Sequence, residues 1–261
     1  MKIALIQLDI VADAKQANLA GIERLLRQAA EAACDVAVLP ELCLTGFSEQ
    51  TAALAEAAEG ATTAALAALA RTHQMHLIVG LAEKVPGQAK VQNLAVAYDR
   101  AGVVVAKYAK IHPFSFAQED RCFLPGNRLV TFAVEGMSAG MFICYDLRFP
   151  EIFRSIAKDV AAFFVIANWP ASRQVHWETL LRARAIENQC FVIGVNRTGA
   201  DARGLRFPGA SHIFDPLGQD LCADHADAAE LLIVEIDPAE TARVRATFPF
   251  LRDMRPFRLF L

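Results

Sequence analysis

Cysteine is present in the chain, but in no pattern that binds a metal ion or forms a redox pair. None of the 6 cysteines belongs to a C-x-x-C pair or follows a zinc-type spacing. They are Cys34, Cys43, Cys122, Cys144, Cys190 and Cys222. We therefore expect reduced thiols, most of them buried, in a cytoplasmic protein without a metal ion.

Long apolar runs and an excess of charge are also missing. No stretch approaches the roughly 18 uninterrupted apolar residues of a membrane-spanning helix. Asp9 interrupts the apolar start at residues 1–10 and no small-residue cleavage site follows, so we expect a first strand there rather than a signal peptide. The net charge of −3 gives no electrostatic reason to bind nucleic acid or an anionic membrane. We expect neither as a partner.

The chain also lacks a linker, a low-complexity block and a fixed-period repeat. Hydrophobic residues make up 54% of it, which allows a substantial core and argues against disorder. A chain of 261 residues is too long for a minimal module and fits one large α/β domain. We expect a single domain over residues 1–261.

Apolar runs of strand length alternate with helical patterns. Helical spacing predicts helices over residues 15–33 and 174–188, and alanine-rich composition predicts one over 51–72. Strand-like runs lie at residues 2–10, 35–42, 76–84, 93–110, 129–136, 139–146, 161–168, 190–196 and 230–237. Residues 93–110 should form a hairpin that turns at 99–102. Hairpins mixed with β-α-β steps predict two sheets packed face to face, with helices outside.

The last segment, residues 247–261, does not fit this scheme. It is apolar, contains several arginines and is interrupted by Pro249 and Pro256. A free tail of this composition would be insoluble. We expect it to pack at a subunit interface.

Polar or reactive side chains follow several of the predicted strands. Glu41, Lys110, Cys144 and Asn168 each come directly after an apolar run. Taken alone, each is more often structural than catalytic, because buried cysteines and surface charges are common.

Together these residue types suit one chemistry. A thiol is a good nucleophile as a thiolate, and a partly desolvated carboxylate can take its proton. Attack on a carbonyl or nitrile carbon develops negative charge, which needs a cation or amide donors. Cys144, Glu41 and Lys110 would supply nucleophile, base and cation, although spacing alone does not bring them together.

Four ordered segments resemble the nitrilase, or carbon–nitrogen hydrolase, superfamily. They are LPELCLTGF at 39–47, YAKIHPF at 108–114, ICYDLRFPE at 143–151 and the stretch at 167–199 that begins ANWP. The last stretch looks most like the amidase branch related to ω-amidases, which hydrolyse the distal amide of 2-oxo acid amides. The resemblance implies a four-layer α-β-β-α sandwich of two mixed β-sheets flanked by helices.

The resemblance also implies roles for individual residues. Glu41 matches the family's general base, Lys110 its oxyanion-stabilising lysine and Cys144 its nucleophile. Glu119 is the best match for a second, supporting glutamate, and the backbone N–H of Tyr145 for the other oxyanion donor. The implied reaction passes through a thioester, uses a small amide and water, and needs no metal or organic cofactor.

The substrate pocket is less determined. A short substrate with a distal carboxylate favours arginine, whose two-pronged donor geometry suits that group. Arg173 is the first candidate and Arg148 the second, although a structural ion pair is equally plausible for Arg148. The other candidate pocket residues are Phe114, Phe116, Asn168 and Trp169, and the aromatic ones are as plausibly core.

Several alternatives remain open. The same catalytic residues would suit an N-carbamoyl amidohydrolase, a nitrilase or another amidase. Cys144 could instead be a redox-sensing thiol, or the chain a non-catalytic interaction protein on this fold. An intact Glu–Lys–Cys set argues against the last two. Because family members commonly pair, we expect a homodimer or a higher homo-oligomer.

Overall fold

The computed structural model describes residues 1–48, 50–223 and 229–255. Its strands are β1 (Lys2–Ile6), β2 (Val36–Val38), β3 (His76–Lys84), β4 (Val91–Tyr98), β5 (Val104–Ala109), β6 (Thr131–Val134), β7 (Met137–Ile143), β8 (Ala162–Ala167), β9 (Phe191–Asn196), β10 (Thr198–Ala200), β11 (Arg206–Pro208), β12 (His212–Phe214) and β13 (Leu231–Glu235). Its α-helices are α1 (Lys15–Glu31), α2 (Thr51–Leu54), α3 (Ala61–His73), α4 (Glu119–Cys122), α5 (Pro150–Ser155), α6 (Gln174–Asn188) and α7 (Glu240–Thr247). Short 3-10 helices are η1 (Ser115–Ala117), η2 (Cys144–Arg148), η3 (Ala171–Arg173) and η4 (Phe250–Asp253).

Two mixed β-sheets form the centre of the molecule. The first has the strand order β13-β1-β2-β3-β4-β5, and the second has the order β12-β9-β8-β7-β6. Within them β1, β2 and β3 run parallel, as do β7, β8 and β9, whereas the outer strands pair antiparallel. Parallel neighbours bring their carboxyl ends to the same edge of a sheet.

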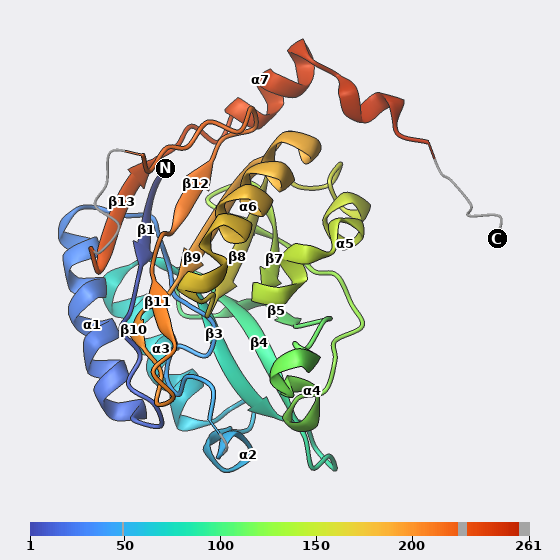
Figure 1. Ribbon diagram of the computed structural model, residues 1–261. Coiled ribbons are helices and arrows are strands. Elements are labelled where there is room, and N and C mark those ends of the chain that lie inside the picture. Colours follow the sequence, from blue (N-terminus) through green and yellow to red (C-terminus); the bar gives the residue numbers. More distant parts are fainter. Residues whose placement is uncertain (49, 224–228, 256–261) are drawn as a thin grey trace, which may run out of the picture.

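Helices cover the outer faces of both sheets, as Figure 1 shows for α1 and α6. Ile22 of α1 and Leu66 of α3 belong to the buried cluster that includes Ile6 and Leu77 of the first sheet. On the second sheet, Trp177 of α6 is buried in the central core. The predicted four-layer sandwich of two mixed sheets flanked by helices is confirmed.

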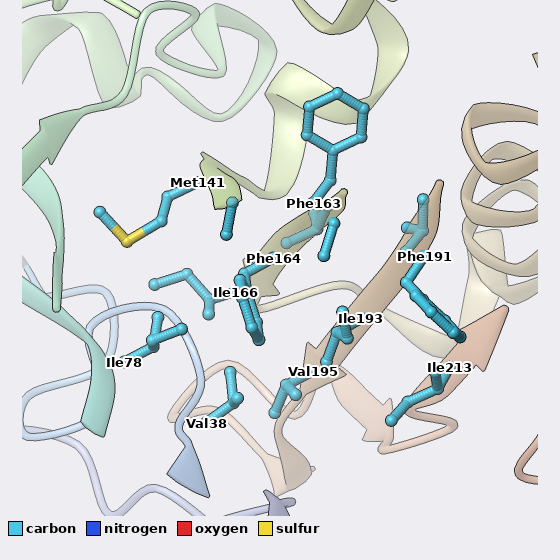
Figure 2. Packing of buried hydrophobic residues seen from close by; sticks show 14 of the residues in the cluster. Val38, Ile78, Met141, Phe163, Phe164, Ile166, Phe191, Ile193, Val195 and Ile213 are labelled. Atoms are coloured by element: carbon cyan, nitrogen blue, oxygen red, sulfur yellow. The ribbon is translucent and has the colours of Figure 1, made fainter. Parts of the chain in front are cut away.

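The space between the sheets is filled by apolar side chains that alternate along each strand. In β2, Val36 and Val38 point into this central core, whereas Ala37 belongs to the cluster under α1 and α3. Figure 2 shows Val38 and Ile78 of the first sheet close to Ile166 of the second. This packing fixes the two sheets relative to one another and therefore fixes the strand ends.

The predicted helix over residues 51–72 is wrong in one respect, because it is divided in two. Ala55 is extended, and Glu56 forms a β-bridge with Glu83 of β3. The Glu56 carboxylate then accepts a 2.7 Å hydrogen bond from the Thr62 N–H at the start of α3. Helix propensity is overridden here because Glu56 supplies an N-terminal hydrogen-bond acceptor from outside the helix.

The carboxyl-terminal segment is described as far as residue 255. The predicted tail at 247–261 begins at the end of α7, continues into η4, and its residues 256–261 lie outside the described part. Phe248 and Phe250 are 43% and 64% exposed, whereas Leu251 is buried. Among the described helices, none is long and apolar enough to cross a membrane.

Candidate active site

Four of the predicted site residues follow strands of the two sheets. Glu41 comes shortly after β2 and Lys110 directly after β5, both in the first sheet. Cys144 and Asn168 directly follow the parallel neighbours β7 and β8 of the second sheet. The structure brings all four together with Glu119, which begins α4.

The position of Glu41 depends on a glycine in the neighbouring strand. A Cβ atom added at Gly80 of β3 would lie 2.5 Å from both the Glu41 Cα and the Pro40 carbonyl oxygen. The Cys43 N–H donates to the Gly80 carbonyl at 3.0 Å, and Leu42 has a left-handed φ of 46°. The turn therefore packs directly on β3 and directs Glu41 into the protein.

Lys110 lies between two buried carboxylates. Its Nζ is 2.8 Å from Oε1 of Glu41 and 2.8 and 3.0 Å from the two carboxylate oxygens of Glu119. Asn93 of β4 donates through Nδ2 to both carboxylates, at 2.7 Å to Glu41 and 3.0 Å to Glu119. The Phe114 N–H also donates to Glu119, at 2.7 Å. None of the four side chains of Glu41, Asn93, Lys110 and Glu119 is exposed, so each charge is offset by a neighbour rather than by water.

Cys144 is held in a strained backbone conformation beside this cluster. Its φ of 45° is left-handed, which is uncommon for a residue with a side chain and is often found at functional sites. The thiol is half-buried, and its Sγ lies 3.9 Å from the Asn168 carbonyl oxygen. The Asn168 N–H donates to Oε2 of Glu41 at 2.9 Å. One residue thus links the thiol to the carboxylate.

The electrostatics of the cluster favour a protonated thiol next to a basic carboxylate. Burial raises the pKa of the Glu41 carboxyl, and Glu119 acts in the same direction against the opposing effect of Lys110. Burial and the Glu41 charge also raise the pKa of the Cys144 thiol well above its ordinary value, although Lys110 lowers it. Burial disfavours the Lys110 ammonium, but the carboxylates of Glu41 and Glu119 outweigh this and raise its pKa. Lys110 therefore stays a cation, and the thiol needs a base.

Tyr145 and Phe114 lie next to each other, and Phe114 contacts Glu119 of the cluster. Tyr145 is in the first turn of η2, where backbone N–H groups have no partner within the helix. Its ring lies 4.7 Å from that of Phe114, which in turn lies 5.7 Å from the ring of Phe116. Phe116 is 85% exposed, so it is not a core residue.

The two candidate arginines lie near different aromatic rings. The Arg173 guanidinium carbon is 5.5 Å from the ring centre of Phe114, and the Arg148 one is 4.9 Å from that of Trp169. Arg148 also lies 3.1 Å from Nδ1 of His176. Trp169 is 3% exposed and belongs to the central core. Of the two arginines, Arg173 therefore shares its aromatic neighbour with Tyr145 of the site.

Two asparagines of the site were not identified from the sequence. Asn93 follows Gln92 near the start of β4, and the sequence there gives no sign that its amide reaches two buried carboxylates. Asn196, the last residue of β9, accepts the Trp169 N–H at 2.7 Å and donates to the Trp169 carbonyl at 2.9 Å. It therefore holds the chain next to Asn168. In the sequence, its position at the end of a predicted strand was the one feature that indicated a role in the site.

Comparisons with known proteins show the family to which the chain belongs. The family model described as carbon-nitrogen hydrolase matches residues 2–246. A 2-oxoglutaramate amidase of Bacillus subtilis is 35% identical over 223 residues, which are 85% of each chain. An ω-amidase, YafV, of Escherichia coli is 32% identical over 260 residues, covering 100% of this chain and 99% of the relative.

A solved structure of a CN-hydrolase superfamily protein from Xanthomonas campestris has the same fold. Its TM-score is 0.91 at 31% identity, and the match covers 99% of this chain and 98% of the other. That structure carries an arsenic adduct in its active site. By family match, identity and fold, the chain belongs to the carbon–nitrogen hydrolase family, as a hydrolase of carbon–nitrogen bonds other than peptide bonds.

Proposed function

We propose that the chain is a cysteine-dependent amidohydrolase that cleaves a small amide to an acid and ammonia, with ω-amidase-like preference for 2-oxo acid amides. The observation that carries this proposal is the buried Lys110 ammonium between Glu41 and Glu119, next to the strained Cys144. A nucleophile, a base and a cation for the oxyanion are thus present within one desolvated site.

In the first half of the reaction, Glu41 accepts the Cys144 proton as sulfur attacks the amide carbon. The raised pKa of Glu41 makes it a stronger base for this transfer than an exposed glutamate. Lys110 and the Tyr145 N–H stabilise the oxyanion that forms. Glu41 then returns the proton to the nitrogen, ammonia leaves, and a thioester remains on Cys144.

In the second half, water replaces ammonia. Glu41 removes a proton from water as its oxygen attacks the thioester carbon, and the same donors hold the second oxyanion. Collapse of this intermediate expels the Cys144 sulfur, which regains its proton from Glu41, and the acid is released. Glu119 supports both halves by fixing Lys110 through two short contacts.

The choice of 2-oxo acid amides rests on the named relatives and on Arg173. Two relatives that match most of the chain are named 2-oxoglutaramate amidase and ω-amidase. Arg173 lies over Phe114, whose N–H binds Glu119, and an arginine there suits a distal carboxylate such as that of 2-oxoglutaramate. Phe114, Asn168 and Trp169 would then border the bound acyl chain. We also propose a cytoplasmic homodimer or higher homo-oligomer.

A substrate screen tests this function. Ammonia release is measured with 2-oxoglutaramate, 2-oxosuccinamate, an N-carbamoyl amino acid, a nitrile and a neutral amide. We expect the two 2-oxo acid amides to give the highest kcat/KM values, and Cys144→Ala to lose activity toward all of them by several orders of magnitude while remaining folded.

Cys222→Ala is a suitable control, because Cys222 is a buried cysteine of the core. If the 2-oxo acid amides are among the poorest substrates, the ω-amidase assignment fails. Full activity of Cys144→Ala would reject the mechanism itself.

A further inference from the structure

Asp146 is a fully buried carboxylate that the proposed reaction does not use. Its Oδ2 accepts hydrogen bonds from the Tyr108 hydroxyl at 2.8 Å and from the Ile143 N–H at 3.1 Å. Its Oδ1 accepts one from the His112 N–H at 3.0 Å and lies 2.8 Å from Nδ1 of the same histidine. All four contacts come from two short segments of the chain.

These segments are the ones that carry the nucleophile and the cation. Tyr108 and His112 lie two residues before and two residues after Lys110. Ile143 directly precedes Cys144, and Asp146 lies two residues after it. A single carboxylate therefore joins the end of β5, in the first sheet, to the turn after β7, in the second sheet.

From this geometry we propose that Asp146 is a positioning residue, which sets the Lys110 ammonium and the Cys144 thiol at their working separation by binding the segments that carry both. The inference rests on the roles proposed above for Lys110 and Cys144. Asp146 itself touches neither the substrate nor the reacting atoms in this scheme.

A carboxylate is needed here because each oxygen accepts two contacts. An asparagine offers one accepting oxygen, so its NH₂ group would face either the His112 N–H or the Ile143 N–H. The partners are themselves fixed: the His112 ring stacks on Phe149 at 3.7 Å, and the Tyr108 ring packs edge-on against Phe142 at 5.6 Å.

The Tyr108 hydroxyl is a donor under all ordinary conditions. Burial and the Asp146 charge raise the pKa of this hydroxyl well above its usual value. Tyr108→Phe therefore removes one donor to Asp146 and keeps the ring in the core. Tyr98→Phe is a matched control, because Tyr98 is an equally buried tyrosine of β4 whose ring belongs to the cluster under α1 and α3.

The experiment compares the wild type with Asp146→Asn, Tyr108→Phe and Tyr98→Phe. Steady-state kcat and KM are measured with the best amide substrate. The rate of Cys144 alkylation by iodoacetamide is measured by mass spectrometry of the peptide that carries it. We expect Asp146→Asn and Tyr108→Phe to lower kcat roughly ten- to hundredfold with little change in KM, and to slow alkylation, because small misplacements of reacting groups have effects of that size. Tyr98→Phe should match the wild type in both.

Thermal melting identifies variants that fail to fold. If Asp146→Asn fails to fold, the comparison of Tyr108→Phe with Tyr98→Phe decides the test. Wild-type kcat and alkylation in Tyr108→Phe, or an equal loss in Tyr98→Phe, would overturn the inference and leave the proposed function intact. If the wild type hydrolyses no amide, the proposed function fails, and the alkylation rates alone decide the role of Asp146: unchanged rates reject it and slower rates in the site variants alone support it.

Discussion

Lys110 is the residue on which the electrostatics of the site depend. A buried ammonium is costly unless it is paired, and here two carboxylates surround it at 2.8 Å. Burial raises the pKa of the Glu41 carboxyl, and Lys110 lowers it without reversing the shift, because Glu119 adds to the effect of burial. The Glu41 carboxylate is therefore a stronger base than usual although it contacts the Lys110 ammonium.

This balance predicts the pH dependence of the enzyme. Glu41 must be ionised to accept the thiol proton, so kcat/KM should fall as the pH drops through the raised pKa of Glu41. The acid limb of the profile should therefore lie above the ordinary glutamate pKa of about 4.3. Circular dichroism at each pH separates this loss from acid unfolding. An acid limb at or below the ordinary value, in a folded protein, would contradict the assignment of Glu41 as base.

The catalytic candidates could be predicted from the sequence to different degrees. Glu41, Lys110 and Cys144 lie in motifs that resemble a family, and each follows an apolar run. Asn93 could not be predicted, because an amide inside a strand gives no indication of which carboxylates it will reach. The link from Asp146 to the Lys110 segment was also not predictable, since it joins two sheets whose alignment depends on the whole core.

The turns after the strands decide where these side chains point. Leu42 and Cys144 both have a left-handed φ, of 46° and 45°, in the turns after β2 and β7. Such conformations persist only where the surroundings stabilise them. Next to Glu41, the surrounding element is β3, whose Gly80 leaves room for the turn.

Gly80→Ala should therefore disturb both stability and activity. Its Cβ would lie 2.5 Å from backbone atoms of Pro40 and Glu41, which cannot move as a flexible side chain does. We expect a loss of about 1–3 kcal/mol in the free energy of unfolding, measured by chemical denaturation, together with a marked loss of kcat. Gly21→Ala in α1 is the control, because its Cβ would meet only the Leu8 side chain, at 3.3 Å. If both variants behave alike, Gly80 has no special role in placing Glu41.

Among the elements, long strands and helices were predictable and short helices were not. The longer strands, such as β3, β4 and β7, and the helices α1 and α6 follow from apolar patterns that extend over many residues, whereas no prediction covered the three-residue strands β10 and β11. The division of residues 51–72 into α2 and α3 was not predictable, because it depends on Glu56 bonding to Thr62 and pairing with β3. The pairing of Glu56 with Glu83 is tertiary, so local helix propensity does not encode it.

The exposed aromatic residues after α7 bear on how the molecule assembles. Phe248 and Phe250 lie with their ring centres 5.8 Å apart, and both are exposed in the single chain. In Figure 1 the red segment that carries them extends beyond the sandwich. Exposed aromatic pairs of this kind are typical of association surfaces.

If these residues contribute to the proposed homodimer, their replacement should weaken it. We expect Phe248→Ser/Phe250→Ser to shift the mass measured by light scattering from that of two chains toward that of one, because buried aromatic residues dominate many interfaces. Phe116→Ser, which changes an even more exposed phenylalanine in η1, should leave the mass unchanged. An unaltered dimer in the double variant would place the interface elsewhere.

The site is divided between the two layers of the sandwich. Glu41 and Lys110 follow strands of one sheet, and Cys144 and Asn168 follow strands of the other. The rate of catalysis therefore depends on the alignment of the two sheets. A shift of roughly 1 Å of one sheet relative to the other would lower the rate on the order of 100-fold, although the hydrogen bonds within each sheet would be kept. Under gentle heating or mild denaturant, turnover should thus decline before the circular dichroism signal of the strands does, so that activity serves as the more sensitive gauge of the native core.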